Sequence, residues 1–142
     1  AVFPAGDEGM KRISGQRGQA MIEFALILPL LLLVMFAIFQ FGFMFYSYIS
    51  IQQAAREGAR SAAVGKNDAL ITTAITNAST LDPTMLTISI APAPATRLAG
   101  SNVTVTVTIP SAQLLKMPLV DAYLPTQLTG QATMRMEQNY IP

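Results

Sequence analysis

The sequence predicts an α+β protein in which a long N-terminal transmembrane helix continues into a small domain. We expect that domain to contain a short second helix and a three-stranded antiparallel sheet. An apolar run near the N-terminus is long enough to cross a bilayer, and helical spacing of small residues continues beyond it. Three later segments alternate apolar and polar side chains, as strands do. The 142 residues leave room for one small domain outside the membrane.

Composition excludes several classes of function. Hydrophobic residues make up 51% of the chain and charged residues 12%, against about a quarter charged in an average soluble domain. The net charge of +1 provides no basic field, so we expect no nucleic-acid partner. The chain has no Cys and no His, which removes the commonest metal ligands, general base and nucleophile. The carboxylates from Glu23 onward are scattered singly, with no paired spacing: Glu23, Glu57, Asp68, Asp82, Asp121 and Glu137. We therefore expect that the protein is not an enzyme and that it has no catalytic residues, no metal and no cofactor.

The apolar run begins at Phe24 and, with Gln40 as an uncharged interruption, extends to Tyr46. About 23 residues at about 1.5 Å each suffice for a hydrocarbon core of about 30 Å. A small domain could hardly cover such a helix as a core element, and the run is too long for a cleavable secretory signal. Pro29 lies inside it and predicts a kink. Aromatic side chains crowd the far end, as in an interfacial belt: Phe39, Phe41, Phe43, Phe45, Tyr46 and Tyr48.

The junction before the run has a distinctive spacing. Gly18 ends a short basic segment, Glu23 stands five residues later, and Phe24 follows it. A carboxylate in this position can simply favour the first turn of a helix and sit among lipid headgroups. The spacing, however, resembles a type IV-type prepilin junction of the Flp (tight-adherence) branch, in which Gly, four residues, Glu and an aromatic follow one another.

That resemblance implies cleavage by a prepilin peptidase between Gly18 and Gln19. Residues 1–18 would then be a leader, and because Met10 precedes two basic residues, residues 1–9 would be an artefact of the assigned start site. In the mature chain the N-terminal ammonium of a neighbouring subunit could neutralise Glu23, since a buried charge is tolerated when it is paired. Glu23 and Phe24 are thus candidate assembly residues.

Beyond the aromatic cluster the helix is predicted to continue as SIQQAAREGARSAAVG and to stop at Gly65. Two parallel rows of small residues allow close approach of another backbone or of a sheet. Read straight through, Met21 to Val64 would measure about 65 Å, so its outer half must dock on something. Glu57 and Arg60 can pair on the exposed side. The candidate helix-packing residues are Ala54, Ala55, Gly58, Ala59 and Ala62.

The stretch from about residue 15 to 65 is similar to the TadE-like family of minor pilins and pseudopilins in tight-adherence pili. The Gly-x-x-x-x-Glu-Phe junction, the Leu/Pro-rich span, the distal aromatic residues and the run AAREGAR all match the family pattern. The last is the most specific, because hydrophobic spans converge easily. The resemblance implies a pilin-like fold.

The remainder predicts the small domain. Lys66-Asn67-Asp68 offers an N-cap for a helix that continues to about Ser79, and Asp82-Pro83 breaks it. Strand-like alternation follows over residues 86–90, 103–109 and 132–137. The long second connection contains Pro118, Pro125 and an apolar patch of Leu114, Leu115, Leu119 and Val120. We expect the Ala/Gly rows to cover the apolar face of the sheet, and the Thr row of the middle strand to face solvent.

These readings divide the chain into a leader (1–18), a transmembrane helix (19–49), its extracytoplasmic continuation (50–65) and an extracytoplasmic α+β domain (66–142). Basic residues on the two sides of the span are nearly balanced, so the cytoplasmic N-terminus rests on the resemblance. The resemblance implies a bacterial inner-membrane protein that acts in pilus assembly, attachment and biofilm formation. It also allows a location in surface pili. Its partners would be other pilin subunits, the prepilin peptidase, the bilayer and the tight-adherence platform. A permanently anchored extracytoplasmic binding module of an envelope complex is the alternative.

Overall fold

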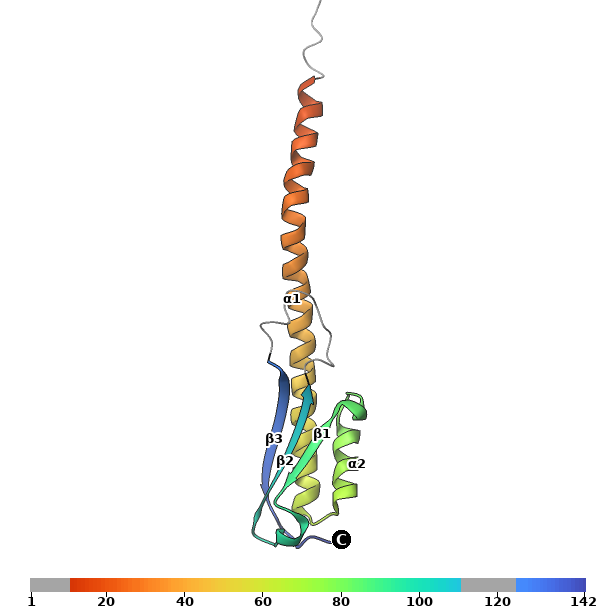
Figure 1. The fold of residues 1–142 in the computed structure, drawn as a ribbon, viewed down its shortest axis with the longest axis vertical. Coiled ribbons are helices and arrows are strands. Elements are labelled where there is room, and N and C mark those ends of the chain that lie inside the picture. The colour runs from red at the N-terminus through yellow and green to blue at the C-terminus, as the bar shows by residue number, and fades with distance from the viewer. Residues whose placement is uncertain (1–10, 111–124) are drawn as a thin grey trace, which may run out of the picture. The chain divides into compact units, whose positions relative to one another are not determined.

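A computed structural model describes the backbone of residues 11–110 and 125–142, and the side chains of residues 18–110 and 125–142. The proposed start-site segment 1–9 and the apolar patch of the second connection lie outside the described residues. The predicted α+β fold, with a long apolar helix, a short second helix and a three-stranded antiparallel sheet, is confirmed. Its elements are α1 (Lys11–Ala63), α2 (Asp68–Ala78), η1 (Pro83–Met85), β1 (Thr87–Ala91), η2 (Pro94–Thr96), β2 (Asn102–Pro110) and β3 (Gln127–Arg135) (Figure 1).

The chain forms two compact units, Ala1–Phe39 and Gln40–Pro142. In the first, α1 runs through Pro29 without interruption. Its side chains from Gly18 onward are largely exposed, as in Met21 (75%) and Leu26 (75%). Among the described residues, α1 is the helix that is long and apolar enough to cross a membrane, over Gly18–Ala63.

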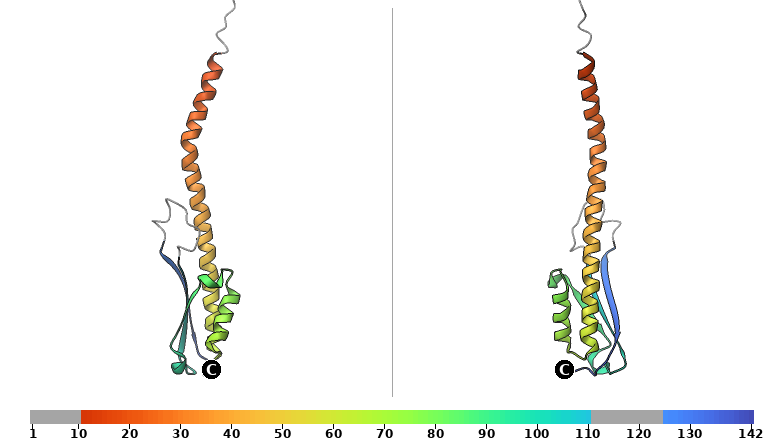
Figure 2. Two further views of the ribbon diagram at one scale, coloured as in Figure 1. Left: turned by 45° about the vertical axis from the view of Figure 1, so that its right-hand side comes forward. Right: turned by 180° about the vertical axis from the view of Figure 1, so that it is seen from behind.

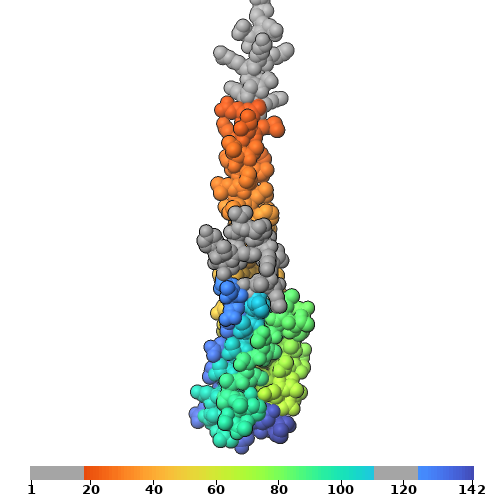
Figure 3. All heavy atoms as spheres, viewed as in Figure 1, coloured from red at the N-terminus to blue at the C-terminus, as the bar shows by residue number. Residues whose placement is uncertain are grey.

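The second unit is a two-layer α/β arrangement. The strands lie in the order β1-β2-β3, and both pairs are antiparallel. Residues 40–63 of α1 pack on one face of this sheet, and α2 lies beside α1 (Figures 1 and 2). In the view of Figure 1, atoms of the three strands and of the loop around η2 lie over the end of α1 (Figure 3).

The core forms where the alternating pattern of β2 meets the small residues of α1. Val103, Val105, Val107 and Ile109 are fully buried, and Ile71 and Ile75 of α2 join them. The intervening threonines of β2 are half-buried on the other face. Thr104 and Thr133 are hydrogen-bonded there with their hydroxyl oxygens 2.8 Å apart.

The third strand differs from its predicted bounds. Alternation was expected over residues 132–137, but β3 spans Gln127–Arg135. Its first half contains Gly130, and glycine weakens the interior of a strand. The lack of a Cβ at this position is what lets α1 approach the strand. Met136 is buried as expected but follows the strand.

Helix ends follow the predicted chemistry. The Asn67 side chain accepts a hydrogen bond from the Leu70 N–H at 2.9 Å and caps α2. Gly65 has φ +79°, which terminates α1. The C-terminal segment donates hydrogen bonds to carbonyl groups at and just beyond this end of α1. The Glu137 N–H donates to Ala63 O and the Ile141 N–H donates to Gly65 O, both at 2.8 Å.

Candidate functional site

The junction identified in the sequence lies within α1. Gly18 and Gln19 have helical backbone, and a Cβ built on Gly18 would meet nothing within 4 Å. Because both backbone groups take part in α1, access of a peptidase to the bond between them would need local unwinding of the helix. Glycine makes such unwinding less costly, since it is about 1 kcal/mol poorer than Ala in a helix interior.

Glu23 and Phe24 project from an uncovered part of the helix. The Gln19 side-chain amide donates a hydrogen bond to Glu23 Oε1 at 3.2 Å. Phe24 is 62% exposed. Within the side chains that the structure describes, no cation forms an ion pair with Glu23. The carboxylate is therefore available to a positive group supplied by another molecule.

The five candidate helix-packing residues face the chain's own domain. Ala54, Ala55 and Ala59 are fully buried and Ala62 is 1% exposed. A Cβ on Gly58 would lie 2.5 Å from Ile75 Cγ1 and 3.1 Å from Val105 Cγ1. The small residues thus let α2 and β2 approach α1 closely. Sequence reasoning anticipated the sheet but not α2 as a partner of these rows.

A buried cation was missed in the sequence. The Arg97 side chain is 1% exposed and forms an ion pair with Asp68, the first residue of α2. Its Nε donates to Pro92 O at 2.7 Å, and its guanidinium lies 5.5 Å from the ring centre of Tyr140. These contacts join α2, the β1–β2 connection and the C-terminal segment. Nothing local in the sequence PAPATR signals such burial.

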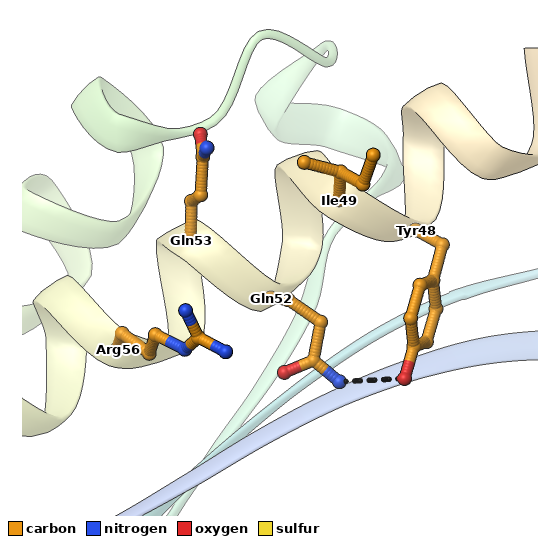
Figure 4. Close-up of a pocket in the computed structure, with 5 residues that line it drawn as sticks. All are labelled: Tyr48, Ile49, Gln52, Gln53 and Arg56. Atoms are coloured by element: carbon orange, nitrogen blue, oxygen red, sulfur yellow. Dashed lines mark hydrogen bonds between the residues drawn. The ribbon is translucent and has the colours of Figure 1, made fainter.

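Two pockets open side by side along α1 in the second unit. An apolar pocket of about 230 Å³ is lined by Met44, Phe45, Tyr48 and Leu128. A second pocket of about 250 Å³ shares Tyr48 and is lined further by Ile49, Gln52, Gln53 and Arg56 (Figure 4). Among the described residues, no group of three or more His, Cys, Asp or Glu side chains could hold a metal ion.

The geometry defines a class of protein: a helix able to span a membrane, with a carboxylate where its apolar run begins, leads into a small α+β domain. Residues 18–60 match the family model described as TadE-like protein, in agreement with the resemblance seen in the sequence. The match begins at Gly18 and includes the whole AAREGAR run. No curated protein and no solved structure matches the chain significantly.

Proposed function

We propose that this protein is a minor pilin or pseudopilin of a tight-adherence pilus, matured by a prepilin peptidase between Gly18 and Gln19. The supporting observation is the family match over residues 18–60, which starts at the proposed cleavage site. In this role the N-terminus lies in the cytoplasm, α1 crosses the bacterial inner membrane, and residues 66–142 lie outside. The mature subunit joins or primes a pilus that serves attachment and biofilm formation.

The exposed apolar surface of α1 suits this role. Side chains from Met21 to Ile49 present a large hydrophobic surface whose exposure to water is energetically unfavourable. Lipid covers it before assembly, and the helices of neighbouring subunits cover it afterwards. The bilayer, other pilin subunits, the peptidase and the assembly platform are accordingly the proposed partners.

Glu23 gives the assembly its register. After cleavage, the new ammonium group at Gln19 of one subunit pairs with the Glu23 carboxylate of the next. An unpaired charge among apolar helices is strongly unfavourable, so this pairing favours one alignment of adjacent helices over shifted ones. The exposure of Glu23 and its modest contact with the Gln19 amide are compatible with such an exchange of partners.

The intact mass of the protein tests the proposal, measured from membranes of cells with and without the cognate prepilin peptidase. We expect a peptidase-dependent mass that corresponds to a chain starting at Gln19. The same uncleaved mass in both strains would contradict processing.

A permanently anchored extracytoplasmic binding module is the second candidate. It is favoured by the uninterrupted helix through Gly18 and Gln19, in which a peptidase would reach the bond only after local unwinding. In that case the leader remains, and the protein stays in membrane fractions rather than in filaments.

A further inference from the structure

The two adjacent pockets on α1 differ in chemistry and share one aromatic wall. The apolar pocket lies between Met44, Phe45 and the start of β3, with Leu128 as its contribution from the strand. The Tyr48 ring forms its boundary toward the polar pocket. The Tyr48 hydroxyl accepts a hydrogen bond from Gln52 Nε2 at 3.0 Å (Figure 4).

In the polar pocket, Gln52 and Arg56 lie on the same side of the helix as Tyr48 (Figure 4). Gln52 and Arg56 follow Tyr48 at intervals of four residues, and the Arg56 guanidinium extends back toward Gln52 (Figure 4). Gln53 also lines the pocket, but its amide points away from Gln52 and Arg56 (Figure 4). Among the described residues, no carboxylate forms an ion pair with Arg56. The pocket therefore offers a positive charge and several N–H donors to an anion.

The location of the pair fits a lipid. The apolar run of the span ends at Tyr46, so Tyr48 lies where a bilayer passes from hydrocarbon to headgroups. Phe45 is 65% exposed and Ile49 is 55% exposed. At about 1.5 Å per residue Arg56 lies about 15 Å beyond Tyr46. Its side chain is directed back toward Gln52 (Figure 4), which brings the guanidinium toward the outer part of a headgroup region that extends about 5–7 Å beyond the hydrocarbon.

From these observations we propose that this surface binds one anionic glycerophospholipid. An acyl chain occupies the apolar pocket, and the phosphate accepts hydrogen bonds from Arg56 and Gln52. An apolar side chain of a neighbouring subunit would fill the first pocket but would leave the guanidinium and the Gln52 amide without a counterpart. Free phosphate would use the second pocket alone. The proposal rests on membrane insertion of α1 but not on pilus assembly.

The sequence offers a specific reporter, because the chain contains no tryptophan. Phe45→Trp in the full chain places a single indole at the apolar pocket. The protein is reconstituted into phosphatidylcholine nanodiscs that contain a minor fraction of acyl-brominated phosphatidylglycerol, and quenching of the indole measures local enrichment of that lipid. Arg56→Gln is introduced in this background, with Arg60→Gln as the matched control, since Arg60 is an exposed arginine of the same helix outside both pockets.

We expect quenching above the value set by the bulk lipid composition. Arg56→Gln should lower the enrichment about fivefold, the factor that one cation contributes near an anionic membrane surface, whereas Arg60→Gln should largely preserve it. Native mass spectrometry of the chain without the reporter should show one retained phosphatidylglycerol, lost with Arg56→Gln.

Quenching at the bulk value, or equal losses with both arginine variants, would overturn the proposal. Failure of the full chain to insert into nanodiscs would overturn it together with the membrane anchor. A chain that inserts but shows no enrichment leaves the pilin proposal intact, because that proposal is tested by cleavage at Gly18.

Discussion

Gly130 of β3 lies directly against the backbone of Ile51 in α1. A Cβ built on Gly130 would be 2.7 Å from the Ile51 carbonyl oxygen and 3.0 Å from Gln52 N. Backbone atoms cannot swing aside as the end of a flexible side chain can. The distance between α1 and the sheet is therefore set at this point by the absence of a side chain.

Gly130→Ala should destabilise the α+β domain by about 1–3 kcal/mol, because the added methyl group forces helix and strand apart in a packed interface. Pulse proteolysis of the detergent-solubilised chain across a urea series measures this change. Gly42→Ala is the matched control, since a Cβ there would meet nothing within 4 Å. Equal unfolding midpoints for Gly130→Ala and the unmodified chain would contradict the close approach.

Asp68→Asn should destabilise the same domain by about 1–3 kcal/mol, the range for a hydrogen bond to a charged group and for a buried charge deprived of its partner. The Arg97 side chain is 1% exposed and the Asp68 side chain 43% exposed, so the substitution leaves a guanidinium that water reaches poorly. The change is read from the urea midpoint in pulse proteolysis. Glu57→Gln removes an exposed carboxylate of α1 and should have little effect.

A double-mutant cycle separates the ion pair from the other contacts of Arg97. Arg97→Lys keeps the charge but cannot retain the two-pronged geometry toward Asp68 together with the bond to Pro92 O. Combined with Asp68→Asn, its effect should be less than additive. Strict additivity would show that the two side chains do not stabilise each other.

Acid should weaken the turn that begins at Asp82. The hydroxyl group of Thr84, and next its backbone N–H, donate hydrogen bonds to the Asp82 carboxylate and lower its pKa below the ordinary 3.8. Because the folded-state pKa is the lower one, Asp82 contributes stability above pH 3.8, and this contribution disappears as the pH falls through the folded-state pKa.

Thr84→Ala should therefore raise the pKa of Asp82 toward its ordinary value, whereas Thr84→Ser, which keeps the hydroxyl, should leave it low. A ¹³C NMR titration of the Asp82 carboxyl carbon measures both. The same titration curve in all three proteins would rule out the hydroxyl group as the main cause.

Local patterns in the sequence predicted much of the fold. The alternation of β2, the Asn67 cap and the small residues of α1 each follow from the geometry of one element, and the structure places them as expected. The start of β3 was missed because Gly130 serves a contact with a residue 79 positions earlier, which no short window contains. Tertiary approach, not strand propensity, determines the residue there.

In the candidate site, too, some groupings of residues could be predicted from the sequence and others could not. The junction from Gly18 to Phe24 was visible because its spacing lies within two helical turns. The burial of Arg97 depends on Asp68, 29 residues away, and on Tyr140, and the apolar pocket needs Leu128 beside Tyr48. Such groupings arise when distant elements meet, so they become evident with the folded structure.

Glu23→Gln tests the assembly role of the junction. The amide preserves the size of the side chain but removes the charge that would pair with a neighbour's N-terminal ammonium, so subunits should lose their preferred register. We expect membrane insertion to be unchanged and the amount of protein in sheared filament fractions to fall about tenfold or more, as for loss of a charged pair of about 1.5 kcal/mol or more. Quantitative immunoblotting of membrane and filament fractions measures both. Glu57→Gln, a carboxylate substitution farther along the same helix, should leave the filament fraction unchanged; normal incorporation of Glu23→Gln would show that Glu23 only favours the local helix.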